Sequence, residues 1–410
     1  MSLSKHKNIP SYDFPEELLS EIFKRLPVKY VLRCGAVQKS WYSLIRTPLF
    51  ISLHSNYQKH TAHVNPKYLV FHDTSNQEIT IRYDDAQCQE YCKFDYPLDL
   101  PACSWCEQAN GLRCLSTMFD KGLDYSPNIY IWNPLVQKFK TVPDSPLFRF
   151  EFEEIQWNAL AFGFLPEVKD YVVIHVLKPS STSTSAPEFF DYDYEKYYLH
   201  SVVIGVYSLN TNSWKKICQD KVFVDDMSVD QSVFVNGTAF WVGFNSHSLD
   251  QLVMYFDTKT NLVRKVVVPG NIAFHERQLE SPLILPFGQY IAYFVEVNED
   301  DPEEGDDDYG SPHLDIWVLK GDIGKFSWKK KMSVSLGENV WAEVFGLRNN
   351  GEPVLAKSND LIAYDLDTHE PYDFVKSCDR LTPDYSYEEG SKPPFVISPF
   401  EETLVLFDID

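Results

Sequence analysis

Four cysteines stand in two close pairs, and this spacing could hold a metal ion. The pairs are Cys88 with Cys92 and Cys103 with Cys106. Four thiolates arranged in two pairs suit the tetrahedral coordination that zinc prefers. Against a zinc site, Cys114 lies close by on an apolar run typical of a β-strand, which indicates ordinary sheet. We predict no metal ion and no cofactor.

The other residue types that carry chemistry form no catalytic motif. The sequence contains no phosphate-binding glycine loop, no HExxH and no GxSxG. The eleven histidines are scattered, and the close group His54, His60 and His63 is expected to be exposed in a linker. Carboxylates are so abundant that a pair of acids acting on a glycosidic bond stays open as an alternative. We predict no catalytic residue.

Residues 14–50 are the first stretch that could position side chains for binding. Asp13 can cap a helix, and Glu16 follows three residues later. An apolar stripe at helical spacing comes next, formed by Leu18, Leu19, Ile22, Phe23 and Leu26. Pro27 ends this helix, and two more are expected, from Val28 to about Val37 and from Lys39 to Pro48. A unit of about 40 residues rarely folds alone, so the stretch is either a helical lid or a docking surface for another chain.

This stretch resembles an F-box over its whole length. The matching positions are Pro15, Leu18, Leu19, Ile22, Leu26, Pro27, Val31, Leu32, Arg33, Val37, Lys39, Ser40, Trp41, Leu44, Ile45 and Pro48. The resemblance implies a domain at residues 10–53 that binds the Skp-type adaptor of a cullin-based ubiquitin ligase. The residues it assigns to adaptor binding are Pro15, Leu18, Ile22, Leu26, Pro27, Val31, Leu32, Val37, Trp41 and Leu44. It also implies a non-catalytic subunit, because the ubiquitin chemistry is done elsewhere in such a complex.

Four positions depart from the F-box pattern. Phe14 stands where Leu is usual, and Cys34, Gly35 and Gln38 replace bulkier or basic residues. Glycine inside a helix costs about 1 kcal/mol relative to alanine, so the second helix is expected to be short or broken.

Charge is distributed unevenly along the 410 residues, whose net charge is −22. Residues 1–53 contain eight Lys and Arg against four Asp and Glu, a balance of +4, which leaves −26 for the rest. Such an acidic body repels nucleic acid and anionic membranes, so neither is an expected partner. The first 15 residues contain no apolar run and no stretch of 18 apolar residues occurs, so we predict a protein of the cytoplasm, the nucleus or both.

After a linker at residues 54–67 the periodicity becomes that of strands. Six hairpin segments can be superimposed: 68–83, 128–142, 203–217, 252–268, 314–332 and 361–375. Most turn at an Asn or Asp, and these turn residues are Asp73, Asn133, Asn210, Asp257 and Asp367. Each segment after the first is preceded by another hairpin, at 109–116, 159–177, 235–244, 283–297 and 349–358. A last hairpin, 395–408, has no partner after it.

The unpaired hairpins at the two ends complete each other if the chain closes into a ring. We therefore predict an all-β propeller over residues 68–410, with six four-stranded blades and the last blade shared between N- and C-terminal strands. Seven blades and a two-sheet sandwich are the alternatives, and about a dozen hairpins are too many for an ordinary sandwich.

The same segments resemble the plant F-box-associated domain, a kelch-like propeller found behind F-boxes. The matching motifs include NGLRCLS, YIWNPLVQKFKTVP, VYSLNTNSWKKI and FDTKTNLVRKVVVP, in family order across residues 100–375. The resemblance implies that the stretch from Cys103 to Cys114 is ordinary sheet, which argues against zinc. Within the family the chain is most similar to S-locus-type F-box proteins.

Three acidic, tyrosine-containing stretches interrupt this pattern, at 178–200, 298–311 and 383–390. They are either solvated loops or a surface that contacts a basic protein. The residues we predict for such substrate binding are Tyr192, Tyr194, Asp300, Glu303, Asp307 and Tyr385. The S-locus resemblance implies secreted-type ribonucleases as targets.

Three functions are compatible with these features. The first is the substrate-recognition subunit of a Skp–cullin–F-box ubiquitin ligase, which binds a protein marked for degradation. The second is an F-box protein that pairs with the adaptor outside a ligase. The third is a propeller enzyme or ligand-binding protein whose F-box only controls its turnover, and it requires converging acids or a metal at the propeller centre.

Overall fold

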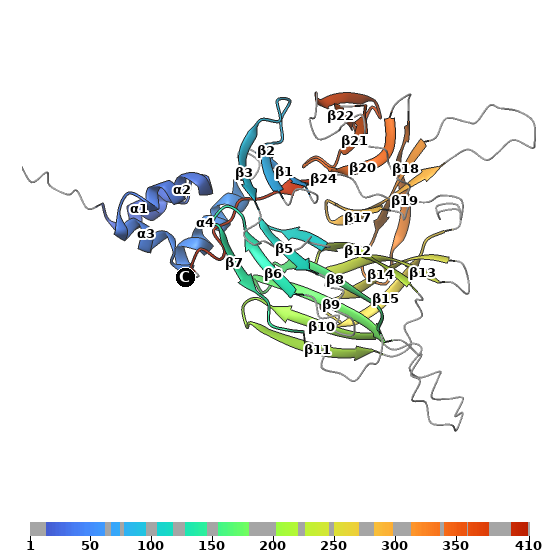
Figure 1. The fold of residues 1–410 in the computed structure, drawn as a ribbon, viewed down its shortest axis with the longest axis horizontal. Coiled ribbons are helices and arrows are strands. Elements are labelled where there is room, and N and C mark those ends of the chain that lie inside the picture. The colour runs from blue at the N-terminus through green and yellow to red at the C-terminus, as the bar shows by residue number, and fades with distance from the viewer. Residues whose placement is uncertain are drawn as a thin grey trace, which may run out of the picture. The chain divides into compact units, whose positions relative to one another are not determined.

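The computed structural model describes residues 14–61, 67–73, 78–95, 105–117, 128–145, 155–179, 202–219, 226–245, 250–269, 283–297, 313–336, 340–358, 360–376 and 395–408 (Figure 1). The chain divides into two compact units. The helical unit contains Met1–Pro66, Asn133–Lys138 and Glu402–Asp410, and the strand body contains Lys67–Trp132 and Phe139–Glu401. Among the described residues, no helix combines the length and apolar character needed to cross a lipid bilayer.

In its described residues the helical unit contains four helices. They are α1 (Glu16–Phe23), α2 (Val28–Gly35), α3 (Lys39–Ile45) and α4 (Pro48–His60). Pro15 and Pro27 take the N-cap positions of α1 and α2, and neither helix has a side-chain cap there. The predicted cap by Asp13 is therefore wrong, since α1 begins after Pro15 and Asp13 lies outside the described residues.

Gly35 ends α2 and allows α3 to approach it closely. A Cβ atom on Gly35 would lie 2.5 Å from Cδ1 of Ile45, which is fully buried. The helix propensity lost at this glycine, about 1 kcal/mol, is offset by the packing of α2 on α3. The second helix is short, as its sequence indicates.

Helix α4 is absent from the sequence prediction, which placed a linker at residues 54–67. Thr47 caps it, because its Oγ1 accepts a hydrogen bond of 3.2 Å from the backbone N–H of Phe50. His54 is buried, and its Nε2 lies 2.9 Å from the carbonyl oxygen of Leu26. The predicted exposure of His54 is therefore wrong. Burial lowers the pKa of His54, so the ring is neutral near pH 7.

Within the described ranges, the strand body contains four sheets of four antiparallel strands each. The first consists of β4 (Trp105–Ala109), β5 (Leu112–Thr117), β6 (Asn128–Asn133) and β7 (Lys138–Thr141). The second consists of β8 (Ile155–Leu165), β9 (Asp170–Pro179), β10 (Val202–Ser208) and β11 (Ser213–Gln219). The third consists of β12 (Asp226–Val235), β13 (Thr238–Asn245), β14 (Asp250–Asp257) and β15 (Leu262–Val267). The fourth consists of β16 (Leu283–Phe287), β17 (Tyr290–Val297), β18 (His313–Lys320) and β19 (Ser327–Ser335).

A fifth sheet has eight strands and joins the two ends of the body. Its order is β23-β22-β21-β20-β24-β1-β2-β3. The strands from the N-terminal part are β1 (Tyr68–Asp73), β2 (Glu78–Tyr83) and β3 (Glu90–Asp95). The others are β20 (Val340–Leu347), β21 (Pro353–Lys357), β22 (Asp360–Tyr364), β23 (Pro371–Val375) and β24 (Phe395–Phe400). The eleven hairpins predicted between residues 68 and 375 are all present as pairs of adjacent strands.

Strand β24 lies between β1 and β20, and the two junctions differ in strength. With β1 it forms an antiparallel ladder of six residue pairs, from Tyr68–Phe400 to Asp73–Phe395, and Figure 1 shows these blue and red strands side by side. With β20 it shares a single parallel pair, Gly346 with Ile397. Gly346 has φ +150°, and a Cβ there would lie 1.7 Å from the Ile397 carbonyl oxygen, so only glycine fits. The eight-stranded sheet is thus two four-stranded halves with a narrow junction.

The predicted hairpin at 395–408 is wrong. Only residues 395–400 form a strand, and residues 402–408 belong to the helical unit. Strand β3, which the sequence prediction missed, supplies the fourth strand beside β24, β1 and β2.

Local turn chemistry explains most of the hairpins. Asn110 and Gly111 have φ +43° and +80°, and Asn236 and Gly237 have φ +50° and +76°, which is the left-handed pair that a type I′ turn requires. At the turn between β22 and β23 the important residue is Asp365. It accepts hydrogen bonds from the backbone N–H groups at 367 and 368, at 2.9 and 2.7 Å, so the predicted role of Asp367 is wrong by two residues.

Neighbouring sheets pack through apolar clusters and are aligned by directional hydrogen bonds. One cluster joins Ile174 of the second sheet to Trp241 of the third. On the outer strands, Trp214 Nε1 donates to the Pro143 carbonyl at 2.7 Å. Trp328 Nε1 of the fourth sheet donates in the same way to the Val267 carbonyl of the third sheet, at 3.2 Å. Each indole therefore ties its own sheet to the preceding one.

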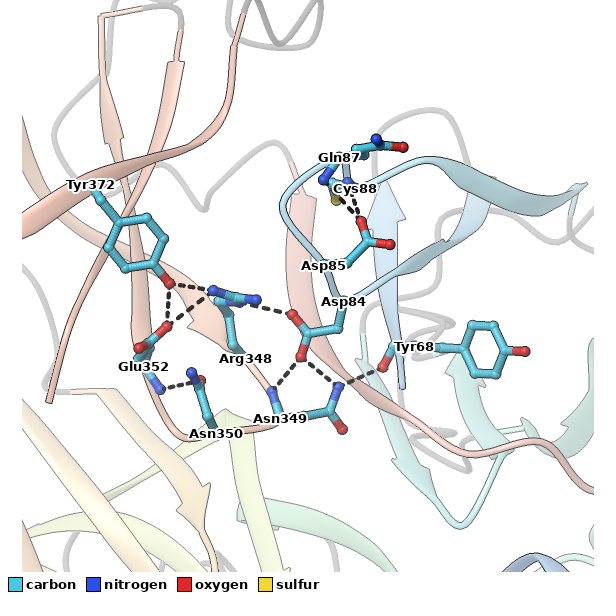
Figure 2. Close-up of polar contacts among 10 residues, drawn as sticks. All are labelled: Tyr68, Asp84, Asp85, Gln87, Cys88, Arg348, Asn349, Asn350, Glu352 and Tyr372. Carbon is cyan, nitrogen blue, oxygen red and sulfur yellow. Dashed lines mark hydrogen bonds and ion pairs between the residues drawn. The ribbon is translucent and has the colours of Figure 1, made fainter. Parts of the chain in front are cut away.

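A partly buried polar network links the two halves of the eight-stranded sheet (Figure 2). Asp84, after β2, accepts hydrogen bonds from Arg348 Nε at 2.8 Å and from the backbone and side-chain nitrogens of Asn349 at 3.0 and 2.8 Å. Arg348 also pairs with Glu352 at 3.1 Å and contacts the hydroxyl of Tyr372. Burial, together with the hydrogen bond donated to Glu352, raises the pKa of Tyr372 to about 12. The network therefore supplements the single backbone pair between β20 and β24.

A second polar link joins three sheets through Glu107 on β4. Its Oε2 accepts a 2.7 Å hydrogen bond from the backbone N–H of Phe162 on β8, and its Oε1 accepts one from the hydroxyl of Ser232 on β12. Burial raises the pKa of Glu107 to about 7, although both hydrogen bonds act in the opposite direction. The folded body thus keeps a proton that the unfolded chain would release at lower pH.

Replacing Asp84 by Asn tests the network of Figure 2. In Asp84→Asn the carboxylate that pairs with Arg348 becomes a neutral amide, and we expect the free energy of unfolding to fall by about 1.5–3 kcal/mol, because Arg348 keeps Glu352 as its acidic partner. The matched control is Glu167→Gln, which breaks the exposed pair with Lys259 and should change it by about 1 kcal/mol or less. Urea unfolding followed by tryptophan fluorescence measures both. Equal stabilities for the two variants would contradict the proposed importance of the network.

The raised pKa of Glu107 predicts a pH dependence. The folded-state pKa of about 7 lies above the ordinary value of 4.5. The free energy of unfolding therefore falls as pH rises from 4.5 to about 7, and this contribution is constant at higher pH. Glu107→Gln keeps an acceptor for Phe162 and cannot ionise, so it lacks this loss. We therefore expect the urea midpoint of Glu107→Gln minus that of the wild type to be larger at pH 8 than at pH 5. A difference that does not change with pH would show that Glu107 titrates normally.

Candidate functional site

Exposed apolar side chains are concentrated on the helical unit. Among the described residues, those from 14 to 49 contribute seven of the thirteen large apolar side chains that are exposed. The seven are Phe14, Leu18, Ile22, Tyr30, Val37, Tyr42 and Leu49. Single exposed apolar residues are ordinary, whereas a concentration of them on one small unit indicates an interaction surface.

Helix α1 arranges part of this surface as a stripe. Leu18 and Ile22 lie four residues apart on α1 and are each 53% exposed, and Phe14 precedes the helix. We call Leu18 and Ile22 the α1 stripe. An adjacent side of α1 buries Leu19 and Phe23, so the helix has one apolar side toward its own unit and another toward solvent.

The ten residues assigned to adaptor binding fall into three groups. The exposed group is Pro15, Leu18, Ile22 and Val37. The half-buried group is Leu26, Pro27, Leu32 and Trp41. The buried pair is Val31 and Leu44. Only the first two groups can contact a partner directly, and Val31 and Leu44 can only support the helices from within.

Trp41 connects the exposed and buried groups. Its ring meets that of Phe23 edge to face, with the centroids 5.3 Å apart, so α3 packs on α1 through this pair. Sequence reasoning did not assign Tyr30, Tyr42 or Leu49 to the surface. Leu49, which follows Pro48 directly and is 82% exposed, could have been found as an apolar residue at a helix start.

Charged residues lie beside the α1 stripe on the same helix. Glu21 pairs with Lys24 and with Arg25, the latter at 3.3 Å. The hydrogen bond from Lys24 lowers the pKa of Glu21, which is fully exposed. These groups form a polar border next to the apolar stripe, an arrangement typical of protein interfaces.

The predicted substrate-binding residues cannot be placed. Tyr192, Tyr194, Asp300, Glu303, Asp307 and Tyr385 all lie outside the described residues.

Two of the four cysteines considered as zinc ligands, Cys88 and Cys92, have described side chains. The side chains of Cys103 and Cys106 lie outside the described residues, and Cys92 is half-buried on β3. Burial raises the pKa of the Cys88 thiol to about 11, which disfavours the thiolate that zinc requires. Within the described part of the chain, no group of three or more His, Cys, Asp or Glu residues is placed to hold a metal ion.

Comparison with known proteins follows the same division of the chain. Residues 12–53 match the F-box domain, and residues 53–366 match the F-box associated beta propeller domain. The Arabidopsis thaliana F-box protein At5g07610 is 24% identical over 78% of this chain and 70% of its own length. A second Arabidopsis thaliana F-box protein, At3g16210, is 24% identical over 62% of this chain, which spans only 60% of that relative.

A solved structure is also similar. It is the beta-propeller domain of the trilobed protease from Pyrococcus furiosus, which is 14% identical, with a TM-score of 0.37 over 68% of this chain and 73% of that one. The F-box associated match covers more than three quarters of the 410 residues. The chain therefore belongs to the family of plant F-box proteins in which an F-box domain is followed by an F-box associated beta propeller domain.

Proposed function

We propose that this protein is the substrate-recognition subunit of a Skp–cullin–F-box ubiquitin ligase. The F-box binds the Skp-type adaptor, and the propeller binds a protein substrate for ubiquitination. The observation that supports the proposal most directly is the α1 stripe of Leu18 and Ile22, exposed on a helix of the matched F-box domain. A small unit that leaves such residues in water gains stability when a partner covers them.

A non-catalytic role is part of the proposal. Glu107 has the strongly raised pKa expected of a general acid, but its two oxygens are occupied by Ser232 and by the backbone of Phe162. Both partners are groups of the fold, so Glu107 serves to join three sheets. The propeller is therefore proposed as a binding surface.

The body is proposed to be a six-bladed propeller. Five blades are the four separate sheets and the half-sheet β20–β23. The sixth is the half-sheet β24-β1-β2-β3, in which the C-terminal strand completes three N-terminal strands. The single pair of Gly346 with Ile397 supports counting the two halves as separate blades.

Charged substitutions in the α1 stripe test adaptor binding. We expect Leu18→Glu combined with Ile22→Glu to weaken binding of a purified Skp-type adaptor by at least about 100-fold, because both side chains would be desolvated at the centre of the interface. Both are already exposed, so the melting temperature of the free protein should be unchanged. Isothermal titration and circular dichroism measure the two quantities.

The control for this experiment is Val168→Glu in the strand body. Val168 is 62% exposed and lies outside the F-box, so its replacement should leave adaptor binding intact. If the double variant binds the adaptor as tightly as the Val168 control does, the α1 stripe is not the docking surface. Co-purification of the wild-type chain with both adaptor and cullin distinguishes a ligase subunit from a protein that pairs with the adaptor alone.

A further inference from the structure

The C-terminal segment packs on the helices of the F-box. We call residues 402–408 the strap. A side-chain oxygen of Glu402 accepts a hydrogen bond of 3.2 Å from the backbone N–H of Val28, the first residue of α2. Five residues later, the carbonyl oxygen of Phe407 accepts a 3.0 Å hydrogen bond from Nε of Arg46, the C-cap residue of α3. The strap therefore bridges the start of α2 and the end of α3.

The contact at α2 supplies a hydrogen-bond acceptor that the N-terminus of this helix lacks. Helix α2 has Pro27 at its N-cap, no side-chain cap and no acidic residue in its first turn. A carboxylate at a helix N-terminus satisfies a free N–H group and interacts favourably with the helix dipole. Glu402 provides this carboxylate from 374 residues further along the chain.

The contact at α3 combines three interactions. Arg46 also donates from its terminal nitrogen to the carbonyl oxygen of Asp408 at 3.2 Å. The ring of Phe407 meets that of Tyr42 edge to face at 5.7 Å, and the Arg46 guanidinium lies over the same Tyr42 ring at 5.3 Å. The strap thus contacts the end of α3 through two carbonyl groups and one aromatic ring.

A buried asparagine holds the strap from its other side. The side-chain nitrogen of Asn133 donates to the carbonyl oxygens of Thr403 and Val405, at 2.9 and 2.8 Å. Its side-chain oxygen accepts the backbone N–H of Leu135 at 3.0 Å. Leu406 adopts φ +73°, a conformation that a residue with a side chain keeps only when its surroundings fix it. The strap is therefore a defined part of the helical unit.

We propose that the strap is required for adaptor docking, because it holds α2 and α3 in the arrangement that the adaptor recognises. Several residues proposed to bind or support the adaptor lie on these two helices: Val31, Leu32, Trp41 and Leu44. The inference rests on the proposed adaptor function. It adds that the last residues of the chain control the affinity of a site that lies near its beginning.

The isosteric substitution Asn133→Asp releases the strap without changing any residue of the helices or of the strap. The new carboxylate still accepts the N–H of Leu135, but it turns two donated hydrogen bonds into contacts between oxygen atoms. The matched control is Asn236→Asp, which removes one amide hydrogen bond of 3.0 Å to the Gln289 carbonyl within the strand body.

Two measurements on the full chain decide the proposal. In Asn133→Asp we expect hydrogen exchange of the α2 and α3 amides to become about tenfold faster and adaptor affinity to fall about fivefold or more, because fewer molecules hold the competent arrangement. Asn236→Asp should change neither. A milder variant, Glu402→Gln, should accelerate exchange in the first turn of α2 only.

Three results would count against the proposal, each in a different way. Unchanged exchange in α2 and α3 of Asn133→Asp would show that the strap does not hold these helices. Faster exchange with wild-type affinity would show that docking does not depend on it. Failure of the wild-type chain to bind the adaptor would overturn the proposed function and the docking inference together, while the exchange data would still report whether the strap holds the helices.

Discussion

The antiparallel ladder between β1 and β24 is the interaction on which the strand body depends. Its six residue pairs join positions 68–73 to positions 395–400 and thereby satisfy the inner edges of both strands. Without this ladder, β1 and β24 would expose unpaired backbone groups at sheet edges, which invite pairing with other chains. The entropic cost of closing so long a loop grows only with the logarithm of its length. The ion pair of Arg348 with Asp84, at 2.8 Å, adds a side-chain contact between the same two halves of the sheet.

Directional hydrogen bonds give the sheets their alignment, whereas apolar packing gives them their cohesion. Apolar burial is non-directional and tolerates small sliding of one sheet on another. The hydrogen bonds from Trp214 and Trp328 to carbonyl groups of the preceding sheet depend on distance and angle, so they restrict this sliding. Gln219 is the clearest case, since its side-chain amide both donates to and accepts from the backbone of Val263 in the next sheet, at 2.7 Å each. One sequence position thus fixes the register between two sheets.

Sequence reasoning succeeded where the cause of a structure is local. The Asn110–Gly111 and Asn236–Gly237 turns, the first three helices and eleven hairpins all depend on neighbouring residues. It failed where the cause is remote. The Nε2 of buried His54 donates to the carbonyl oxygen of Leu26, and in place of the expected hairpin at 395–408 the last residues of that range contact Val28 and Arg46. Of the candidate site, the exposed α1 stripe follows from helical spacing, but spacing alone cannot tell which of two apolar sides faces water.

The F-box illustrates a conflict between binding and folding. Helices of seven or eight residues are marginal in water, so their stability comes from tertiary packing. The exposed side chains of Leu18 and Ile22 add little to that packing, because they do not fill the unit's own core. Other elements of the unit therefore contribute to its stability. Helix α4 supplies the buried residues Phe50 and Ile51, and the strap supplies a hydrogen-bond acceptor to α2 and an aromatic contact to α3. The three helices thus depend for part of their stability on segments that follow them in the chain.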